Sequence, residues 1–389
     1  MQPFAGYLLE RTISPELIEG LKTGLYQLYG GTVRIAPGFE GAGQIVRHLI
    51  PISGDVSTYA SGFTHMLPLG SKGFTTLLAN TNSANQATQL LLGYGSQLMT
   101  MASLNLAVTA VGFAVLTYKL DQLSKKLEEI KNDVKAVRQL LERQELAKLR
   151  TALADLERLP DFSGSDRLGF INNARVTLSR LAHQYAELLA QEEEEHRDMA
   201  YEELFCIASL SHVRCYAELG EFQLAQKEMA KTLKTWRTEA RKIADNLLGK
   251  DPSRYLHSDF VNEIPITTVI DWLNFAREEE KGFEWLEYLR SKMPPYYKQN
   301  ITLSLNLPVQ FPEQDKLEAE KKFVIPSLNK LITRDKVLEG YVTQYALLGA
   351  LKVTPTEFEK QIAAAAPENA VDGYLILEPV SQPTTEQKG

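Results

Sequence analysis

Apolar residues recur with alternating steps of three and four over residues 113–141. This heptad pattern over four repeats predicts a helix that pairs with another helix. After a phase shift the pattern resumes at Leu146, Leu149, Leu153 and Leu156, as at a stutter. No proline occurs from Leu69 to Leu159, so we predict one long helix over about residues 96–159. Its helix-pairing positions after Phe113 and Leu116 are Leu120, Leu123, Leu127, Ile130, Val134, Val137 and Leu141.

The hydrophobic pattern elsewhere predicts short mixed elements at both ends of the chain and helices between them. Ser14, Pro15 and a Gly-Gly pair frame a helix over residues 14–29. A helical region follows the long helix and ends near residue 248. Further elements expected are a strand at 32–36, an apolar stretch at 45–52, a strand at 301–307, helices at 316–334 and 336–350, and a last strand at 373–380.

These elements predict a mainly α fold, with a long coiled-coil-like central helix, a helical C-terminal domain and minor β structure. We divide the chain into six parts on this basis. They are a small charge-poor α+β module (1–72), an uncharged membrane segment (73–118), a long heptad helix (119–160), a helical domain (161–298), a small α+β region (299–380) and a disordered tail (381–389).

The most unusual pattern is the absence of charge from residues 73–118. These 46 residues contain no Asp, Glu, Lys, Arg or His. Soluble proteins seldom go so long without charge, because their surfaces need solvation. The last part, residues 98–118, is mainly apolar and has the length of a bilayer-spanning helix. Its expected membrane-inserting residues are Leu98, Met101, Leu104, Leu106, Val108, Val111, Phe113, Val115 and Leu116.

Polar residues within this segment make it a marginal membrane span. Thr100, Ser103, Asn105 and Thr109 each need a hydrogen-bond partner in hydrocarbon. We therefore expect a conditional segment, stable both when shielded from water and when inserted into lipid. Nine Lys and Arg residues lie between residues 119 and 150, so the positive-inside rule keeps the helical region in the cytoplasm. The alternative is a helix buried permanently in a large helical core.

Composition separates two environments and excludes some partners. Residues 1–118 carry only ten of the 91 formal charges of the 389-residue chain, whose net charge is −7. This mild acidity argues against nucleic acid as a partner. We expect Cys206 and Cys215 to be buried structural thiols, because two cysteines cannot form a disulfide framework. The N-terminus lacks the pattern of a secretory signal. The prediction is a cytoplasmic, membrane-associated protein.

Few residues suggest chemistry. The loop at residues 38–43 contains Gly38, Gly41 and Gly43 and is a candidate anion-binding loop. Its spacing is not the dinucleotide fingerprint and no Walker lysine follows, which favours a turn or β-bulge. The six histidines are scattered, and a single Glu-x-x-His falls short of a di-iron site. We expect no catalytic residues, no metal and no cofactor.

Two partial resemblances complete the sequence evidence. Residues 216–220, with Ala225 and Met229, resemble one tetratricopeptide hairpin, and no second copy follows. A hydrophobic segment leading into a very long helix, over about residues 73–160, resembles the architecture of α-helical pore-forming toxins and of membrane-targeting effectors. The resemblance implies a non-enzymatic effector that associates with or permeabilises a lipid membrane. It would oligomerise through the long helix or pair with an acidic helix, of which 187–203 is one candidate.

Two alternatives to this effector remain. One is a soluble helical scaffold or adaptor with the uncharged segment in its core. The other is a nucleotide-binding module in residues 1–70, which depends on the glycine loop alone.

Overall fold

The computed structural model of the chain describes ten stretches of sequence. The uncharged segment and most of the heptad pattern lie outside them. The described residues are 7–10, 14–29, 32–53, 136–190, 199–257, 260, 264–292, 317, 320–365 and 372–379.

Helices dominate these stretches, and the predicted fold class, mainly α with minor β structure, is confirmed. Two 3₁₀ turns and one π turn connect or begin helices: η1 (Leu159–Asp161), η2 (Pro252–Leu256) and η3 (Glu320–Val324). The α-helices are α1 (Pro15–Lys22), α6 (Ala136–Glu157), α7 (Gly164–Ala190), α8 (Ala200–Glu218), α9 (Phe222–Leu248), α11 (Ile266–Arg277), α12 (Glu284–Lys292), α15 (Ile325–Leu351) and α16 (Pro355–Ala365). The strands are β1 (Tyr7–Glu10), β2 (Tyr26–Tyr29), β3 (Thr32–Ile35), β4 (Ile45–Ser53) and β5 (Asp372–Pro379).

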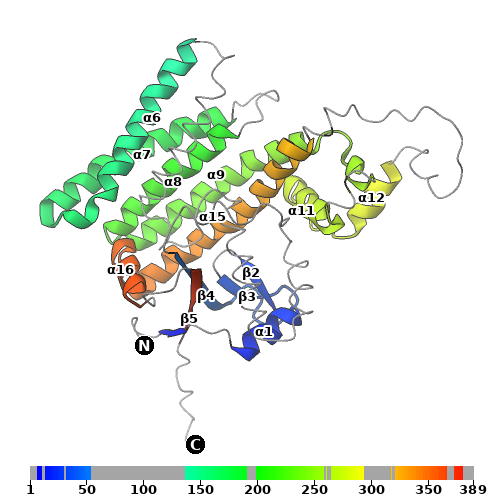
Figure 1. Ribbon diagram of the computed structural model, residues 1–389, viewed down its shortest axis with the longest axis horizontal. Helices are drawn as coiled ribbons and strands as arrows, with labels where there is room; N and C mark the ends of the chain where they lie inside the picture. Colours follow the sequence, from blue (N-terminus) through cyan, green and yellow to red (C-terminus); the bar gives the residue numbers. More distant parts are fainter. Residues whose placement is uncertain are drawn as a thin grey trace, which may run out of the picture.

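The long helices α6, α7, α8, α9 and α15 lie side by side in that order (Figure 1). Helix α8 lies in the middle of the row and buries residues on all sides of its circumference, including both cysteines. Cys206 and Cys215 are free and buried, which confirms the predicted burial of both thiols. Helix α11 packs against α9 and α15. The result is a helical layer whose core is centred on α8 and α9.

An antiparallel sheet lies beside α15, with strand order β1-β5-β4-β3-β2 (Figure 1). The last strand, β5, pairs with both β1 and β4. Residues from the two ends of the sequence therefore share one sheet. This pairing gives the predicted strand at 373–380 its partners, which no local pattern could specify because the pairing is long-range.

Helix α8 and helix α9 form the helical hairpin predicted from residues 216–229. Gly220 has φ +82°, the left-handed conformation that glycine adopts without strain. The amide of Glu221 donates to the carbonyl of Tyr216 at 2.9 Å, which closes the end of α8. Ala225 and Met229 are fully buried in α9.

The predicted helix over residues 14–29 is wrong in its second half. The helix begins as expected, with Ser14 accepting a hydrogen bond from the amide of Leu17. It ends at Lys22. The hydroxyl of Thr23 donates to the carbonyl of Glu19 and caps the last turn, and Gly24 then turns the chain with φ +77°. Residues 26–29 then form β2, paired with β3. Tertiary pairing therefore overrides the local helical pattern here.

The helices predicted at 316–334 and 336–350 are not separate, because α15 runs without a break from Ile325 to Leu351, directly after the π turn η3. Asp335, where we expected a break, lies inside it and pairs with Arg237 of α9. A contact between distant residues thus supports a helix interior where the sequence pattern predicted a break. The predicted strand at 301–307 lies outside the described residues.

Helix α6 is the C-terminal part of the predicted long helix, and it is the part of that helix that the structure describes. It stops at Glu157, before the turn that contains Pro160. Leu149, Leu153 and Leu156 are almost fully buried where α6 packs on α7. The shifted end of the heptad pattern therefore pairs with a helix of the same chain. Across the described residues, we find no helix with both the length and the apolar character needed to span a bilayer.

Candidate functional site: a cationic pocket beside the sheet

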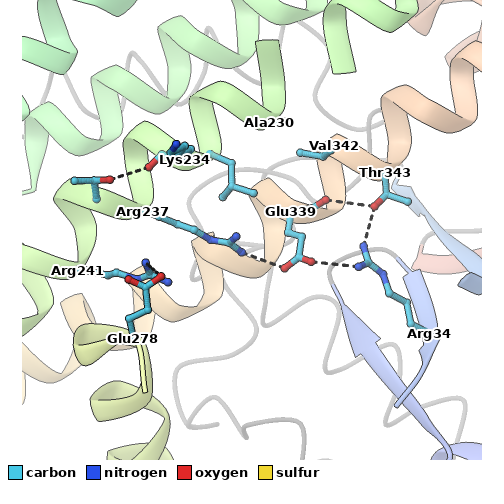
Figure 2. Close-up of a pocket in the computed structure, with 11 residues that line it drawn as sticks. Arg34, Ala230, Lys234, Arg237, Arg241, Glu278, Glu339, Val342 and Thr343 are labelled. Atoms are coloured by element: carbon cyan, nitrogen blue, oxygen red, sulfur yellow. Dashed lines mark hydrogen bonds and ion pairs between the residues drawn. The ribbon is translucent and has the colours of Figure 1, made fainter. Parts of the chain in front are cut away.

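A pocket of about 650 Å³ lies where β3 faces helices α9 and α15 (Figure 2). Four of the lining side chains are cations: Arg34, Lys234, Arg237 and Arg241. Two are carboxylates, Glu278 and Glu339. The remaining lining residues are small, apolar or hydroxylic: Ala230, Leu233, Thr238, Val342 and Thr343.

Helix α9 supplies three of the cations through its periodicity. Lys234, Arg237 and Arg241 are spaced by three and four residues, so they share one face of the helix. The neighbouring face carries Trp236 and Ala240, both fully buried in the core. The same helix thus fixes the core on one side and presents a row of positive charge on the other.

Arg34 reaches the pocket from the sheet. The β3–β4 register shifts between Val33 and Arg34, a β-bulge of the kind that re-aims a side chain. Its Nη1 donates to Oε1 of Glu339 at 3.2 Å, and its Nη2 donates to the hydroxyl of Thr343 at 2.8 Å. Figure 2 shows Arg34 and Arg237 approaching Glu339 from opposite sides. Glu339 therefore links a strand to two helices.

Arg237 forms the central ion pairs of the pocket. Its Nε donates to Oδ1 of Asp335 at 2.6 Å, and its Nη2 donates to Glu339 at 3.2 Å. Burial alone would lower the pKa of this guanidinium, but the hydrogen bonds and charges of Asp335 and Glu339 raise it overall. Arg237 therefore stays charged, and its planar fork is held in one orientation.

Arg241 closes the pocket at the end of α11. Its Nη1 lies 2.7 Å from Oε1 of Glu278, the residue that ends α11 with φ +55°. Glu278 is 72% exposed, so this ion pair is largely solvated. The Nε atom of Arg241 is buried and has no hydrogen-bond partner among the described residues. One donor of this guanidinium is therefore unused by the part of the protein that the structure describes.

Formal charge in the pocket is not balanced. The four cations exceed the two carboxylates by two charges, and by one if Asp335 beside Arg237 is included. The chain as a whole carries a net charge of −7. The pocket is therefore locally positive on a chain of negative net charge, so it attracts anions more strongly than the rest of the surface does.

His48 of β4 pairs with Thr32 of β3, two residues before Arg34. Its side chain is buried, and burial followed by the positive charge of Arg34 lowers its pKa to about 4. His48 is therefore neutral at pH 7 and adds no charge to the pocket.

A second cluster of charge lies in the helical core. Glu202 of α8 and Arg334 of α15 form a salt bridge in which both side chains are almost completely buried. Oε1 of Glu202 also accepts hydrogen bonds from Trp236 at 2.7 Å and from Cys206 at 3.4 Å. Burial alone would raise the pKa of Glu202, but the charges of Arg334 and Lys330 and the hydrogen bonds from Trp236 and Arg334 lower it overall. Every group here has a fixed protein partner, which indicates a structural role.

The predicted site residues fall into three groups in the structure. The membrane-inserting positions at 98–116 and the helix-pairing positions at 120–134 lie outside the described residues. Val137 and Leu141 lie on α6, in the part whose side chains are not described. Gly38, Gly41 and Gly43 are in the loop between β3 and β4, all with positive φ.

That glycine loop uses its own amides to close a hairpin. The amides of Phe39, Ala42, Gly43 and Gln44 donate to carbonyls of the same hairpin at 2.9–3.4 Å. These donors are therefore engaged, which favours the turn interpretation over the anion-binding one. No group of three His, Cys, Asp or Glu residues that could hold a metal occurs within the described stretches.

Sequence reasoning missed the pocket residues, although one signal for them was present. The basic stripe Lys234, Arg237 and Arg241 is visible on α9 by spacing alone. Arg34 and Glu339 are 305 residues apart in sequence, and only the fold brings them together. No protein-family model, curated protein or solved structure matches the chain.

Proposed function

We propose that this protein is a non-enzymatic, membrane-associating effector whose uncharged segment at residues 73–118 contacts lipid. The observation that carries the proposal is the run of 46 residues without a charged side chain or a histidine. A surface of that composition is poorly solvated in water and compatible with a bilayer. In this proposal residues 98–118 insert conditionally, and the basic region that follows stays on the cytoplasmic side.

The described fold supports this proposal through the elements that flank the segment. On one side β4 ends at Ser53 within the sheet, paired with β3 and β5. On the other side α6 is fixed to α7 by Leu149, Leu153 and Leu156. The segment is therefore connected to two anchored elements, and the helical layer can restrain it. Pairing through residues 113–141, with a second copy or an acidic helix, is part of the same proposal.

Vesicle flotation and dye release with purified protein test the proposal. A Val108→Lys/Val111→Lys variant puts two charges into the apolar run, each costing about 3 kcal/mol at a bilayer centre. We expect the natural chain to float with vesicles and release dye, and the double variant to lose both activities. Val176→Lys is the matched control, because Val176 of α7 is an exposed apolar residue. Absence of flotation at every pH and lipid composition would refute the proposal.

A soluble helical scaffold is the second candidate function. The packing of α6 on α7 favours it, because that end of the heptad pattern is already paired within the chain. In this case the uncharged segment is buried in the protein. A monodisperse species without detergent, with slow amide exchange at residues 98–118, would support the scaffold over the effector.

A further inference from the structure

We propose that the cationic pocket binds a small polyanion that carries phosphate groups. The residues that line the pocket include none of residues 73–118, and the inference does not depend on membrane association. Its basis is the excess of positive charge in a pocket of about 650 Å³ on a chain of net charge −7. Ligand pockets commonly have volumes of about 300–1,000 Å³, so this one has room for a small phosphorylated compound.

Several donors in the pocket are left over after the ion pairs are counted. The ammonium of Lys234 has no carboxylate partner among the described residues. Arg237 donates through Nε and Nη2 to Asp335 and Glu339, and its Nη1 has no acceptor among the described residues. Nε of Arg241 is buried without a partner there as well. Lys234 and Arg237, on one face of α9, therefore keep donors that a ligand can use.

The carboxylates of the pocket set the charge that the ligand needs. Glu339 already accepts hydrogen bonds from Arg34 and Arg237, and Glu278 pairs with Arg241. A monovalent anion would gain little over these internal partners. A phosphate group with two negative charges matches guanidinium forks bidentately and competes better. The apolar side chains of Leu233 and Val342 give the rest of the ligand a surface to contact.

The pocket lies between the sheet and α9, so a bound ligand would affect how firmly these two parts are linked. Arg34 belongs to the sheet, whereas Arg237 and Lys234 belong to α9. A polyanion held by both would bridge the sheet and α9 more strongly than the Glu339 carboxylate does now. Binding should therefore raise the thermal stability of the protein.

Titration with pyrophosphate at constant ionic strength tests the site directly. We expect a rise in Tm and a measurable binding heat for the natural chain. Lys234→Met should weaken binding about tenfold or more, the effect of losing one charge-assisted hydrogen bond. Because Lys234 is exposed and unpaired among the described residues, this variant should fold normally. Lys231→Met is the matched control: it lies on the same helix, is 75% exposed and is absent from the pocket lining.

A second variant tests the competition with the internal carboxylate. Glu339→Gln removes a negative charge that accepts hydrogen bonds from both arginines. We expect pyrophosphate to bind this variant several times more tightly than it binds the natural chain. Unchanged or weaker binding by the Glu339→Gln variant would contradict the proposed position of the ligand.

The source of the phosphate is distinguished by parallel experiments with vesicles. Binding of pyrophosphate that Lys234→Met weakens supports a free soluble ligand. Binding only to vesicles containing a phosphoinositide, again weakened by Lys234→Met, supports a lipid headgroup. Absence of both, or binding that Lys234→Met leaves unchanged, overturns the proposal. The Val108→Lys/Val111→Lys variant separates the two proposals, because it removes the apolar membrane contact and leaves the pocket intact.

Discussion

Two clusters of charge use the same helix, α15, and differ in how completely the protein neutralises them. In the core, Arg334 is 1% exposed and Glu202 is 0% exposed. They form an ion pair, and Glu202 also accepts hydrogen bonds from Trp236 and Cys206. In the pocket, Arg237 and Glu339 are 30% and 31% exposed, and cations outnumber carboxylates. A closed, fully partnered cluster fixes the fold, whereas an open cluster with spare donors can accept a ligand.

The difference follows from the cost of removing charge from water. A buried ion needs partners for all its polar atoms, because the effective desolvation penalty is several kcal/mol per ion. A half-exposed ion keeps part of its hydration and tolerates a missing partner. Arg334 and Glu339 lie five residues apart on α15. The buried Arg334 therefore needs partners for its polar atoms, whereas the partly exposed Glu339 tolerates a missing one.

Loss of one partner in the buried pair should have the largest effect. Arg334→Met leaves the Glu202 carboxylate in the core without its main counter-charge. We expect the free energy of unfolding to fall by about 3–5 kcal/mol, measured by urea denaturation monitored by circular dichroism. Lys330 and Trp236 remain near Glu202 and keep the effect within that range.

The matching double variant shows whether unpaired charge is the cause. Glu202→Leu/Arg334→Met removes both ions and should be less destabilised than Arg334→Met alone. If the double variant loses as much free energy of unfolding as Glu202→Leu and Arg334→Met lose in sum, packing and not charge dominates the core cluster.

Acid should destabilise both regions through neutral histidines. Burial and Arg34 lower the pKa of His48 to about 4, and burial lowers that of His212 on α8 to about 4. The unfolded chain gains a proton near pH 6.5, so stability falls as pH drops from 6.5 towards 4. Each histidine should cost about 2 kcal/mol by pH 5.

Unfolding experiments at pH 7.5 and pH 5 can assign this loss to one side of the molecule. His48→Gln should remove the contribution of the pocket side, and His212→Gln that of the bundle. If both variants keep the full pH dependence of the natural chain, neither histidine is the source.

The ion pair between Arg237 and Glu339 should contribute much less than the buried pair. Both side chains are nearly one-third exposed. A double-mutant cycle with Arg237→Gln and Glu339→Gln should give a coupling energy of about 0.5–1 kcal/mol. A coupling above about 3 kcal/mol would place the pocket with the structural cluster and remove the distinction between them.

Salt should produce the smallest change and act on one cluster only. Raising NaCl to about 1 M shortens the Debye length to about 3 Å. The Arg237–Glu339 coupling should fall by a few tenths of a kcal/mol, while the Glu202–Arg334 coupling stays constant. Equal salt dependence of the two cycles would show that water reaches the core pair.

Much of the local structure was predictable because it depends on short-range pattern. Apolar spacing located α9 and its end near residue 248, and the aromatic-glycine pattern located the hairpin at Gly220. The fate of residues 26–29 was not predictable. They continue a helical pattern, yet pair with β3 as a strand. A strand forms where a partner is available, and that partner is set by the whole fold.

The pocket shows the same division. The sequence by itself determined the basic stripe on α9, the burial of the cysteines and the long run without charge. Only the tertiary structure decided that Arg34 and Glu339 would meet across 305 residues, and that β5 would lie between β1 and β4. The physical reason is that helical faces follow from local periodicity. Strand pairing and converging charges instead depend on contacts between residues far apart in the chain.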